Sequence, residues 1–202
     1  MKNTKSFRAG IKLGEGKINN FSRLIAYFID WYIATMVAGI PIVLINSFVK
    51  HTTDVSQDLS TLPTNMAILA GILGIVFYIG YFVVLELFVY KGQTFGKRIM
   101  KIKVVKKDGS NVDFWTIIKR EVIGVMLIEG YIANSSSYLR QIVSIATGVN
   151  VMDMAVYLFG IISAISILMG MASTSRKMIH DYIAGTCEIS NKEEQQGEAF
   201  HA

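Results

Sequence analysis

The sequence predicts an all-α membrane protein with about four transmembrane helices and both termini in the cytoplasm. Of its 202 residues, 52% are hydrophobic and only 17% are charged, whereas soluble domains carry about 25% charged residues. Three segments are apolar over at least the length that a spanning helix needs. The basic residues gather beside these segments instead of being spread along the chain. Length, hydropathy and charge therefore agree on a membrane fold.

The first two predicted helices each contain one acidic residue. Residues 24–49 form an apolar run of 26 residues that contains Asp30, and residues 66–90 form a run of 25 residues that contains Glu86. A carboxylate placed in hydrocarbon costs about 2.5–3.5 kcal/mol on insertion scales. We therefore expect a partner, a water-filled cavity or a function to compensate each of these side chains.

The third and fourth helices follow from the distribution of charge. Residues 154–172 contain no charge and predict the core of a helix at about 151–173. Eighteen of the 20 Lys and Arg residues lie in residues 2–23, 91–120 and 176–192. The positive-inside rule places all three regions in the cytoplasm, so the chain must cross twice between the last two of them. A third helix at about 116–133 is expected despite its weak hydropathy.

The connecting segments complete the predicted organisation. Residues 1–20 form a basic cytoplasmic segment, residues 21–190 the transmembrane domain, and residues 191–202 a polar tail. Residues 134–138 predict a turn, and residues 139–149 an interfacial helix on the outer side or an extension of the fourth helix.

The inner loop at residues 91–113 contains a strand-like segment. Apolar residues and Lys alternate over residues 100–104, which is the period of a β-strand. A second strand-like segment, residues 186–189, is a candidate to pair with it on the cytoplasmic face.

The antiparallel topology brings three ionisable groups toward one layer of the inner leaflet. Asp30, Glu86 and Arg120 all lie within about two turns of the inner ends of their helices. Buried charges are usually paired, and two carboxylates with one arginine leave a charge that a proton or a cation could neutralise. The layer can equally be a structural clamp or a partner-binding feature. Arg23 leans toward the N-terminus of its helix, so it should point away from Asp30 toward water.

The remaining reactive residues do not predict an enzyme. The single Cys187 excludes an internal disulfide and a multi-cysteine zinc site. His51, His180 and His201 show no metal-binding spacing, and no nucleophile accompanies the His180–Asp181 pair. We expect no catalytic residues, no metal and no cofactor. The net charge of +5 follows from membrane topology, so we expect no nucleic-acid partner.

Three segments together resemble the RDD family. They are residues 23–30 (RLIAYFID), residues 92–98 (GQTFGKR) and residues 176–186 (RKMIHDYIAGT). The resemblance implies a compact membrane domain whose defining residues correspond to Arg23, Asp30 and Asp181. It also implies one of two activities, because some members look like monovalent cation/proton antiporters and others modulate a membrane protease.

Two functional hypotheses therefore stand for this multi-pass protein of a bacterial inner membrane. In the first, Asp30 alternates between a proton and a monovalent cation, Glu86 tunes its affinity and Arg120 supplies the counter-charge. Arg23 and Asp181 would then close an inner mouth.

Arg176 and His180 also lie at this predicted mouth. In the second hypothesis, the chain is a non-transporting adaptor or regulator of a membrane partner, such as a protease inhibitor or a stress or export accessory protein. Besides the lipid bilayer, its partner would be a second copy of the chain or another membrane protein.

Overall fold

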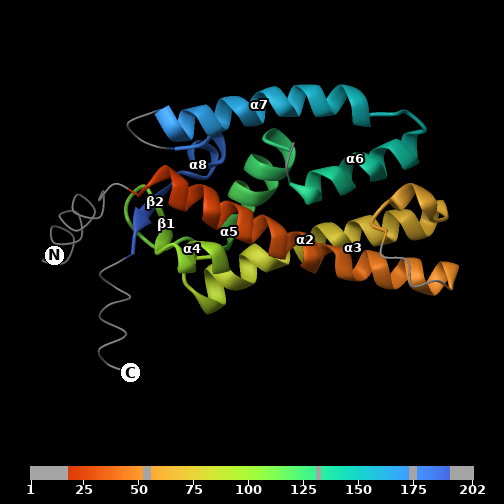
Figure 1. The fold of residues 1–202 in the computed structure, drawn as a ribbon, viewed down its shortest axis with the longest axis horizontal. Coiled ribbons are helices and arrows are strands. Elements are labelled where there is room, and N and C mark those ends of the chain that lie inside the picture. Colours follow the sequence, from red (N-terminus) through yellow and green to blue (C-terminus); the bar gives the residue numbers. More distant parts are fainter. Residues whose placement is uncertain (1–17, 52–55, 131–132, 173–176, 192–202) are drawn as a thin grey trace, which may run out of the picture.

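A computed structural model describes residues 18–51, 56–130, 133–172 and 177–191. The described chain is mostly helical, and one small sheet lies at the end of the molecule where the first long helix begins (Figure 1). The predicted terminal segments lie almost wholly outside the described residues, as does Arg176.

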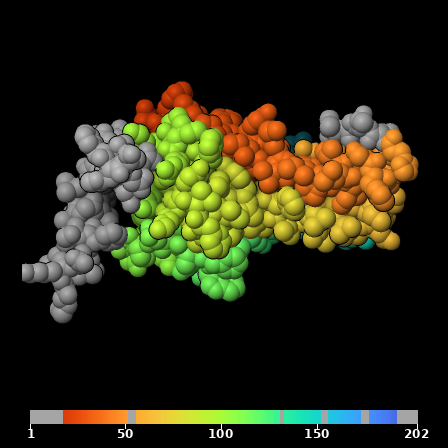
Figure 2. Space-filling model, turned by 90° about the horizontal axis from the view of Figure 1, so that it is seen from below, coloured from red at the N-terminus to blue at the C-terminus, as the bar shows by residue number. Residues whose placement is uncertain are grey.

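Two long antiparallel helices form the centre of the molecule. Helix α2 is Asn20–Lys50, and its first turn is capped by the Asn19 side chain, which accepts a hydrogen bond from the amide of Phe21. Helix α3 is Thr64–Val83 and continues as the π-helical segment η2, Val84–Val89. Both are long and apolar enough to cross a membrane, as predicted. Figure 2 shows them side by side along the molecule.

Small residues bring α2 and α3 together. Ala34, Ala38, Ala67 and Ala70 are completely buried between the packed helices. Small side chains allow close approach of helix backbones, which is the usual packing mode of helices in a membrane. The short helix η1, Leu59–Thr61, lies in the connection between the two helices.

The third predicted helix is shorter than expected and is followed by a separate helix. Helix α5, Phe114–Ile118, continues into the π-helical η3, Lys119–Ile128, and then ends. Helix α6, Asn134–Thr147, begins where a turn was predicted. In Figure 1, η3 rises from α5 toward α7, and α6 then runs to the end where α2 and α3 are joined. The third pass along the molecule therefore consists of two helices in series.

Helix α6 is separate from α7, so the alternative that these residues extend the fourth helix is wrong, whereas the interfacial alternative stays a prediction. Its polar face packs against α3 and η1. Ser136 Oγ donates to the carbonyl of Met126 at 2.7 Å, and Arg140 Nη1 donates to the carbonyl of Gly130. These are carbonyls that the end of η3 leaves without helical partners. The polar side chains face the protein and satisfy that backbone, so a hydropathy average understates how internal α6 is.

The last long helix, α7, is Met152–Ala172, close to its predicted bounds. It lies along one side of the molecule over α6 and η3 (Figure 1). The short helix α8, Ile179–Ala184, follows it and packs against η3.

The predicted pairing of the two strand-like segments is confirmed within a mostly helical fold. Strand β1, Ile102–Lys106, pairs antiparallel with β2, Thr186–Ser190, with Ile102 opposite Ser190 and Lys106 opposite Thr186. Helix α4, Phe95–Ile99, precedes β1 and packs against α2. Gly185, which lies between α8 and β2, has a φ of 68°, a conformation that favours glycine. The chain can therefore turn directly from α8 into β2.

Gly96 provides a test of how α4 packs on α2. A Cβ at this position would overlap the carbonyl oxygen of Ala26 and lie 3.0 Å from Asp30 Oδ2. We expect Gly96→Ala to lower the free energy of unfolding in detergent by about 1–3 kcal/mol, because overpacked sites must shift their backbone.

Gly80→Ala is the matched control. Nothing lies within 4 Å of a Cβ at Gly80 in α3, and alanine is the better helix former by up to about 1 kcal/mol. Equal thermal stability of the Gly96→Ala protein and the wild type would contradict this packing.

Candidate functional site

Asp30 is held by three hydrogen-bond donors. Its Oδ1 accepts from Tyr81 Oη and from the amide of Gly96, both at 2.8 Å, and its Oδ2 accepts from Thr94 Oγ1. The side chain is buried, with 4% exposure. Hydrogen bonds from these donors replace the water contacts that the buried carboxyl group loses. Asp30 therefore fastens the start of α4 to α2.

Glu86 and Lys97 form a second buried contact. Lys97 Nζ lies 2.8 Å from Glu86 Oε1, and the Glu86 side chain is fully buried. Burial lowers the pKa of Lys97, but the charge of Glu86 and of other nearby carboxylates outweighs it, so the pKa is raised and Lys97 stays charged. Glu86 Oε2 is buried and has no hydrogen-bond partner among the described residues.

Arg120 is the centre of the largest group of polar contacts. Its Nη1 donates to Asp181 Oδ1 at 2.6 Å and to Thr186 Oγ1 at 3.1 Å. Its Nη2 lies 3.4 Å from Glu188 Oε1, and its Nε lies 3.6 Å from Glu121 Oε1. Burial raises the pKa of Asp181, but the adjacent Arg120 outweighs it and holds the pKa well below its usual range.

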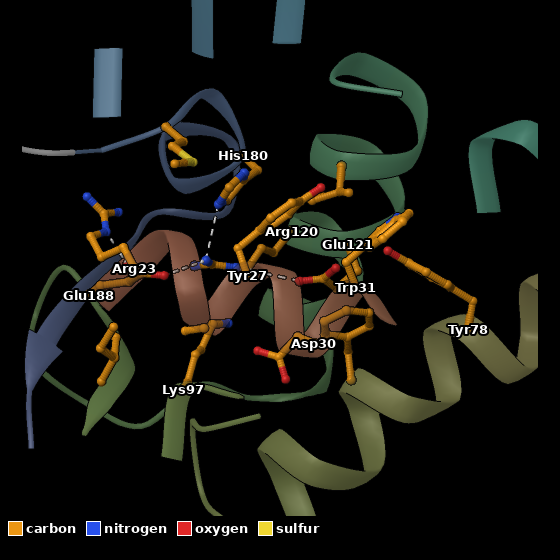
Figure 3. Close-up of a pocket in the computed structure, with 15 residues that line it drawn as sticks. Arg23, Tyr27, Asp30, Trp31, Tyr78, Lys97, Arg120, Glu121, His180 and Glu188 are labelled. Atoms are coloured by element: carbon orange, nitrogen blue, oxygen red, sulfur yellow. Dashed lines mark hydrogen bonds and ion pairs between the residues drawn. The ribbon is translucent and has the colours of Figure 1, made fainter. Parts of the chain in front are cut away.

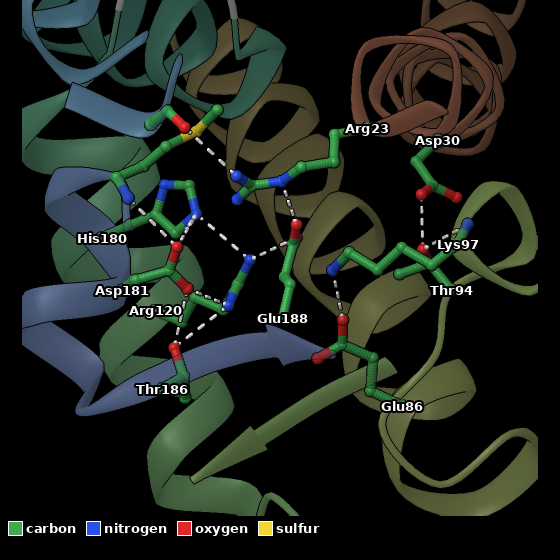
Figure 4. A network of polar contacts seen from close by, with 12 residues as sticks. Arg23, Asp30, Glu86, Thr94, Lys97, Arg120, His180, Asp181, Thr186 and Glu188 are labelled. Atoms are coloured by element: carbon green, nitrogen blue, oxygen red, sulfur yellow. Dashed lines mark hydrogen bonds and ion pairs between the residues drawn. The ribbon is translucent and has the colours of Figure 1, made fainter. Parts of the chain in front are cut away.

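Arg23 joins this group through Glu188. Arg23 Nε lies 2.6 Å from Glu188 Oε2, and Nη1 donates to the carbonyl of Gly170 at 3.4 Å. The Arg23 side chain is only 9% exposed, so the prediction that it points into water is wrong. In this structure Arg23 and Asp181 have different partners, because Glu188 lies between the two arginines and Asp181 is bound to Arg120 (Figure 4).

His180 connects Arg120 to a carboxylate at the end of η3. Its Nε2 lies 3.1 Å from Arg120 Nη2, and its Nδ1 lies 3.0 Å from Glu129 Oε2. A neutral imidazole protonated on Nδ1 satisfies both contacts, since Nε2 then accepts from Arg120. Glu129 also accepts from the His180 amide and from Ser166 Oγ. The Glu129 side chain is only 13% exposed, because η3 ends beside α8.

The structure brings the three predicted site residues to one end of the molecule but not into one cluster. Asp30, Glu86 and Arg120 are all buried. Each contacts different partners, and Arg120 does not bridge the two carboxylates. The sequence missed Lys97 and Glu188, although one lies in the basic loop and the other in a predicted strand. Neither residue stood out, because a hydropathy reading treats loop charges as solvated.

A cavity of about 80 Å³ lies between Asp30 and Arg120. It has room for several water molecules, since one needs roughly 10–15 Å³ of such volume. Its walls are made by aromatic residues of α2 and α3 and by charged residues from the surrounding elements (Figure 3). They include Tyr27, Asp30, Trp31, Tyr78, Phe82, Lys97, Arg120, Glu121, His180 and Glu188.

A comparison with models of protein families finds a match that covers most of the chain. The model of the RDD family matches residues 19–185. The chain belongs to the RDD family. Together with the apolar helices, RDD membership identifies a membrane protein. The match covers Arg23, Asp30 and Asp181 and ends before β2, so Glu188 lies beyond it. No curated protein and no solved structure matches the chain.

Removal of Arg120 tests whether the polar group holds this RDD chain together. Arg120→Met would leave Asp181 buried without its arginine partner and would remove one of the two arginines that contact Glu188. Breaking a buried ion pair in this way costs about 3–5 kcal/mol, and we expect that loss in the free energy of unfolding. Lys119→Met is the control, because the neighbouring lysine is exposed; similar losses in the two variants would contradict the assignment.

The lowered pKa of Asp181 predicts a dependence of stability on acid. A carboxylate whose pKa is lower in the folded than in the unfolded state stabilises the fold above its unfolded pKa of about 3.9, and that contribution is lost as pH falls toward the folded value. We expect Asp181→Asn to be less stable than wild type at pH 7 but to lose less stability between pH 7 and pH 3. Thermal unfolding across this range measures the difference, and parallel curves would contradict it.

Proposed function

We propose that this RDD protein exchanges a monovalent cation for a proton at the cavity beside Arg120. The single observation that carries the proposal is an excess of buried negative charge. The network of polar contacts at this end of the described chain has five carboxylates and three permanent cations, with the Glu129–His180 pair beside them; three of the carboxylates and all three cations line the cavity itself. The carboxylates are Asp30, Glu86, Glu121, Asp181 and Glu188, and the cations are Arg23, Lys97 and Arg120.

Glu121 is the carboxylate that best fits the exchanging role. It lines the cavity with 4% exposure. Its contact to Arg120 is long, at 3.6 Å, and Arg120 makes a shorter contact to Asp181. Asp30, by contrast, already has three donors. We therefore assign the change of charge to Glu121 and a positioning role to Asp30, in place of the alternation first expected for Asp30.

The proposed topology places this cavity near the cytoplasmic surface of the cell membrane. Helices α2, α3 with η2, η3 with α6, and α7 would make the four passes, with both termini inside. The support is the position of the basic loop, residues 91–113, which lies at the same end as the cavity. Lysines and arginines concentrate on the cytoplasmic side of membrane proteins.

Flux through reconstituted protein tests the proposal. Proteoliposomes containing a trapped pH indicator would receive a gradient of Na⁺, K⁺ or an organic monovalent cation. We expect cation-driven proton movement in the wild type and a loss of about tenfold or more in Glu121→Gln, because an amide carries no exchangeable charge. Asp108→Asn, which changes an exposed turn, should retain wild-type flux.

Two results would contradict the proposal. One is an absence of cation-driven proton movement in folded wild-type protein. The other is flux in Glu121→Gln equal to that of Asp108→Asn.

The alternative function is a non-transporting adaptor that regulates a membrane partner. It is favoured by α7, which presents large apolar side chains such as Leu158, Ile161 and Leu168 on its outer face. A second copy of the chain or another membrane protein could pack there. Extraction in mild detergent followed by mass determination would distinguish a homodimer from a stable heteromeric complex, and the latter would favour the adaptor.

A further inference from the structure

We infer that the ligand of this cavity is a small alkylammonium ion instead of a bare alkali cation. The inference names the substrate class of the cavity to which the proposed function assigns cation exchange, and it rests on that assignment. The geometry that points to it is one buried carboxylate facing a wall of aromatic rings. Figure 3 shows Tyr27, Trp31 and Tyr78 around Glu121.

The carboxylate supplies the charge that a cation would meet. Glu121 makes no hydrogen bond within the described part of the chain, and its contact to Arg120 Nε is long at 3.6 Å. Arg120 Nη1 and Nη2 are turned toward Asp181 and Glu188. One guanidinium therefore serves three carboxylates, and Glu121 is the one held least closely. A positive charge placed in the cavity would complete its neutralisation.

The aromatic wall selects the kind of cation. Tyr27 and Trp31 come from α2, and Tyr78 and Phe82 from α3, and all four line the cavity. Aromatic faces attract cations within about 6 Å of the ring, and they bind quaternary ammonium groups especially well because methyl groups also gain apolar contact. A methylated ammonium matches both the rings and the carboxylate.

The same wall is poorly suited to a bare metal cation. Hard cations require about six oxygen ligands. Within the described ranges, no three His, Cys, Asp or Glu side chains are arranged to hold a metal ion. The Asp30 oxygens are already engaged by three donors. An alkali ion in this cavity would have to keep most of its own hydration water.

The cavity volume sets the size of the ligand. About 80 Å³ accommodates several water molecules, which is the room that an ammonium group with a few methyl substituents would occupy. A long alkyl chain would not fit inside. Tetramethylammonium is therefore a suitable probe, and its permanent charge prevents it from crossing the bilayer as a neutral base.

Trp31 provides a built-in reporter. The chain contains two tryptophans, and the other, Trp115, is 69% exposed in α5. In a Trp115→Phe background the fluorescence arises from Trp31 in the cavity wall. Detergent-solubilised full-length protein would be titrated with tetramethylammonium chloride, with sodium chloride at equal concentration, and with tert-butanol, which has a similar shape and no charge.

We expect a saturable change of Trp31 fluorescence with tetramethylammonium, none with Na⁺, and at least tenfold weaker binding of tert-butanol. Glu121→Gln should weaken tetramethylammonium binding by about tenfold or more. Phe82→Leu removes one ring with little change of volume and should weaken it by about threefold to tenfold. The Phe82→Leu variant keeps the test decisive if Glu121→Gln fails to fold. The control variant Asp108→Asn should bind tetramethylammonium as the Trp115→Phe protein does.

Three results would overturn the inference: no saturable response to tetramethylammonium, an equal response to Na⁺, or undiminished binding in both cavity variants. These results are separable from failure of the proposed function. If tetramethylammonium does not bind while Na⁺ or K⁺ drives Glu121-dependent proton movement in proteoliposomes, exchange stands and the alkylammonium assignment falls. If neither occurs, both fall.

Discussion

Neutralisation of Arg120 is the constraint on which the arrangement of this end of the molecule depends. A guanidinium that is 3% exposed must be paired, because an isolated buried charge is very costly. Its partners come from α8 and β2, which lie about 60 residues later in the chain. The contacts of these partners with Arg120 also set the position of β2, and β2 positions β1 through the antiparallel strand pairing. Glu188 extends the same contacts to Arg23 in α2.

The break between η3 and α6 depends on satisfying the backbone groups at the end of η3. A helix that ends inside a protein leaves its last carbonyls without helical partners. The serine and arginine side chains of α6 supply donors to the end of η3. The polar residues of α6 are therefore the ones that allow the helix to break. The break also turns Glu129 toward His180 and Ser166.

The cavity combines features that the separate ion pairs do not explain. Asp30 and Lys97 each have close partners, and a structural clamp would need no more than these contacts. Glu121 adds a carboxylate that the clamp does not require, and it faces a cavity with an aromatic wall. Ionisable groups inside membrane proteins usually mark functional sites, because their burial is otherwise unfavourable. This is the physical basis for assigning a cation site here instead of a purely structural layer.

The sequence by itself determined the membrane class, the two long helices and the family, and it indicated two short strand-like segments as candidates to pair. These depend on local quantities, namely run length, charge position, strand period and motif, which remain readable without contacts. It also indicated that Asp30, Glu86 and Arg120 lie at one depth, because helix length and direction set depth. Only the tertiary structure decided which charged side chains form ion pairs with one another. The rotation of each helix about its axis places Lys97 beside Glu86. The return of β2 to the helices places Glu188 between two arginines. Helix rotation and the position of β2 both depend on side-chain packing between segments that are distant in the sequence. The same packing made α6 internal, since a polar residue can be buried once its partner is a carbonyl on a neighbouring helix.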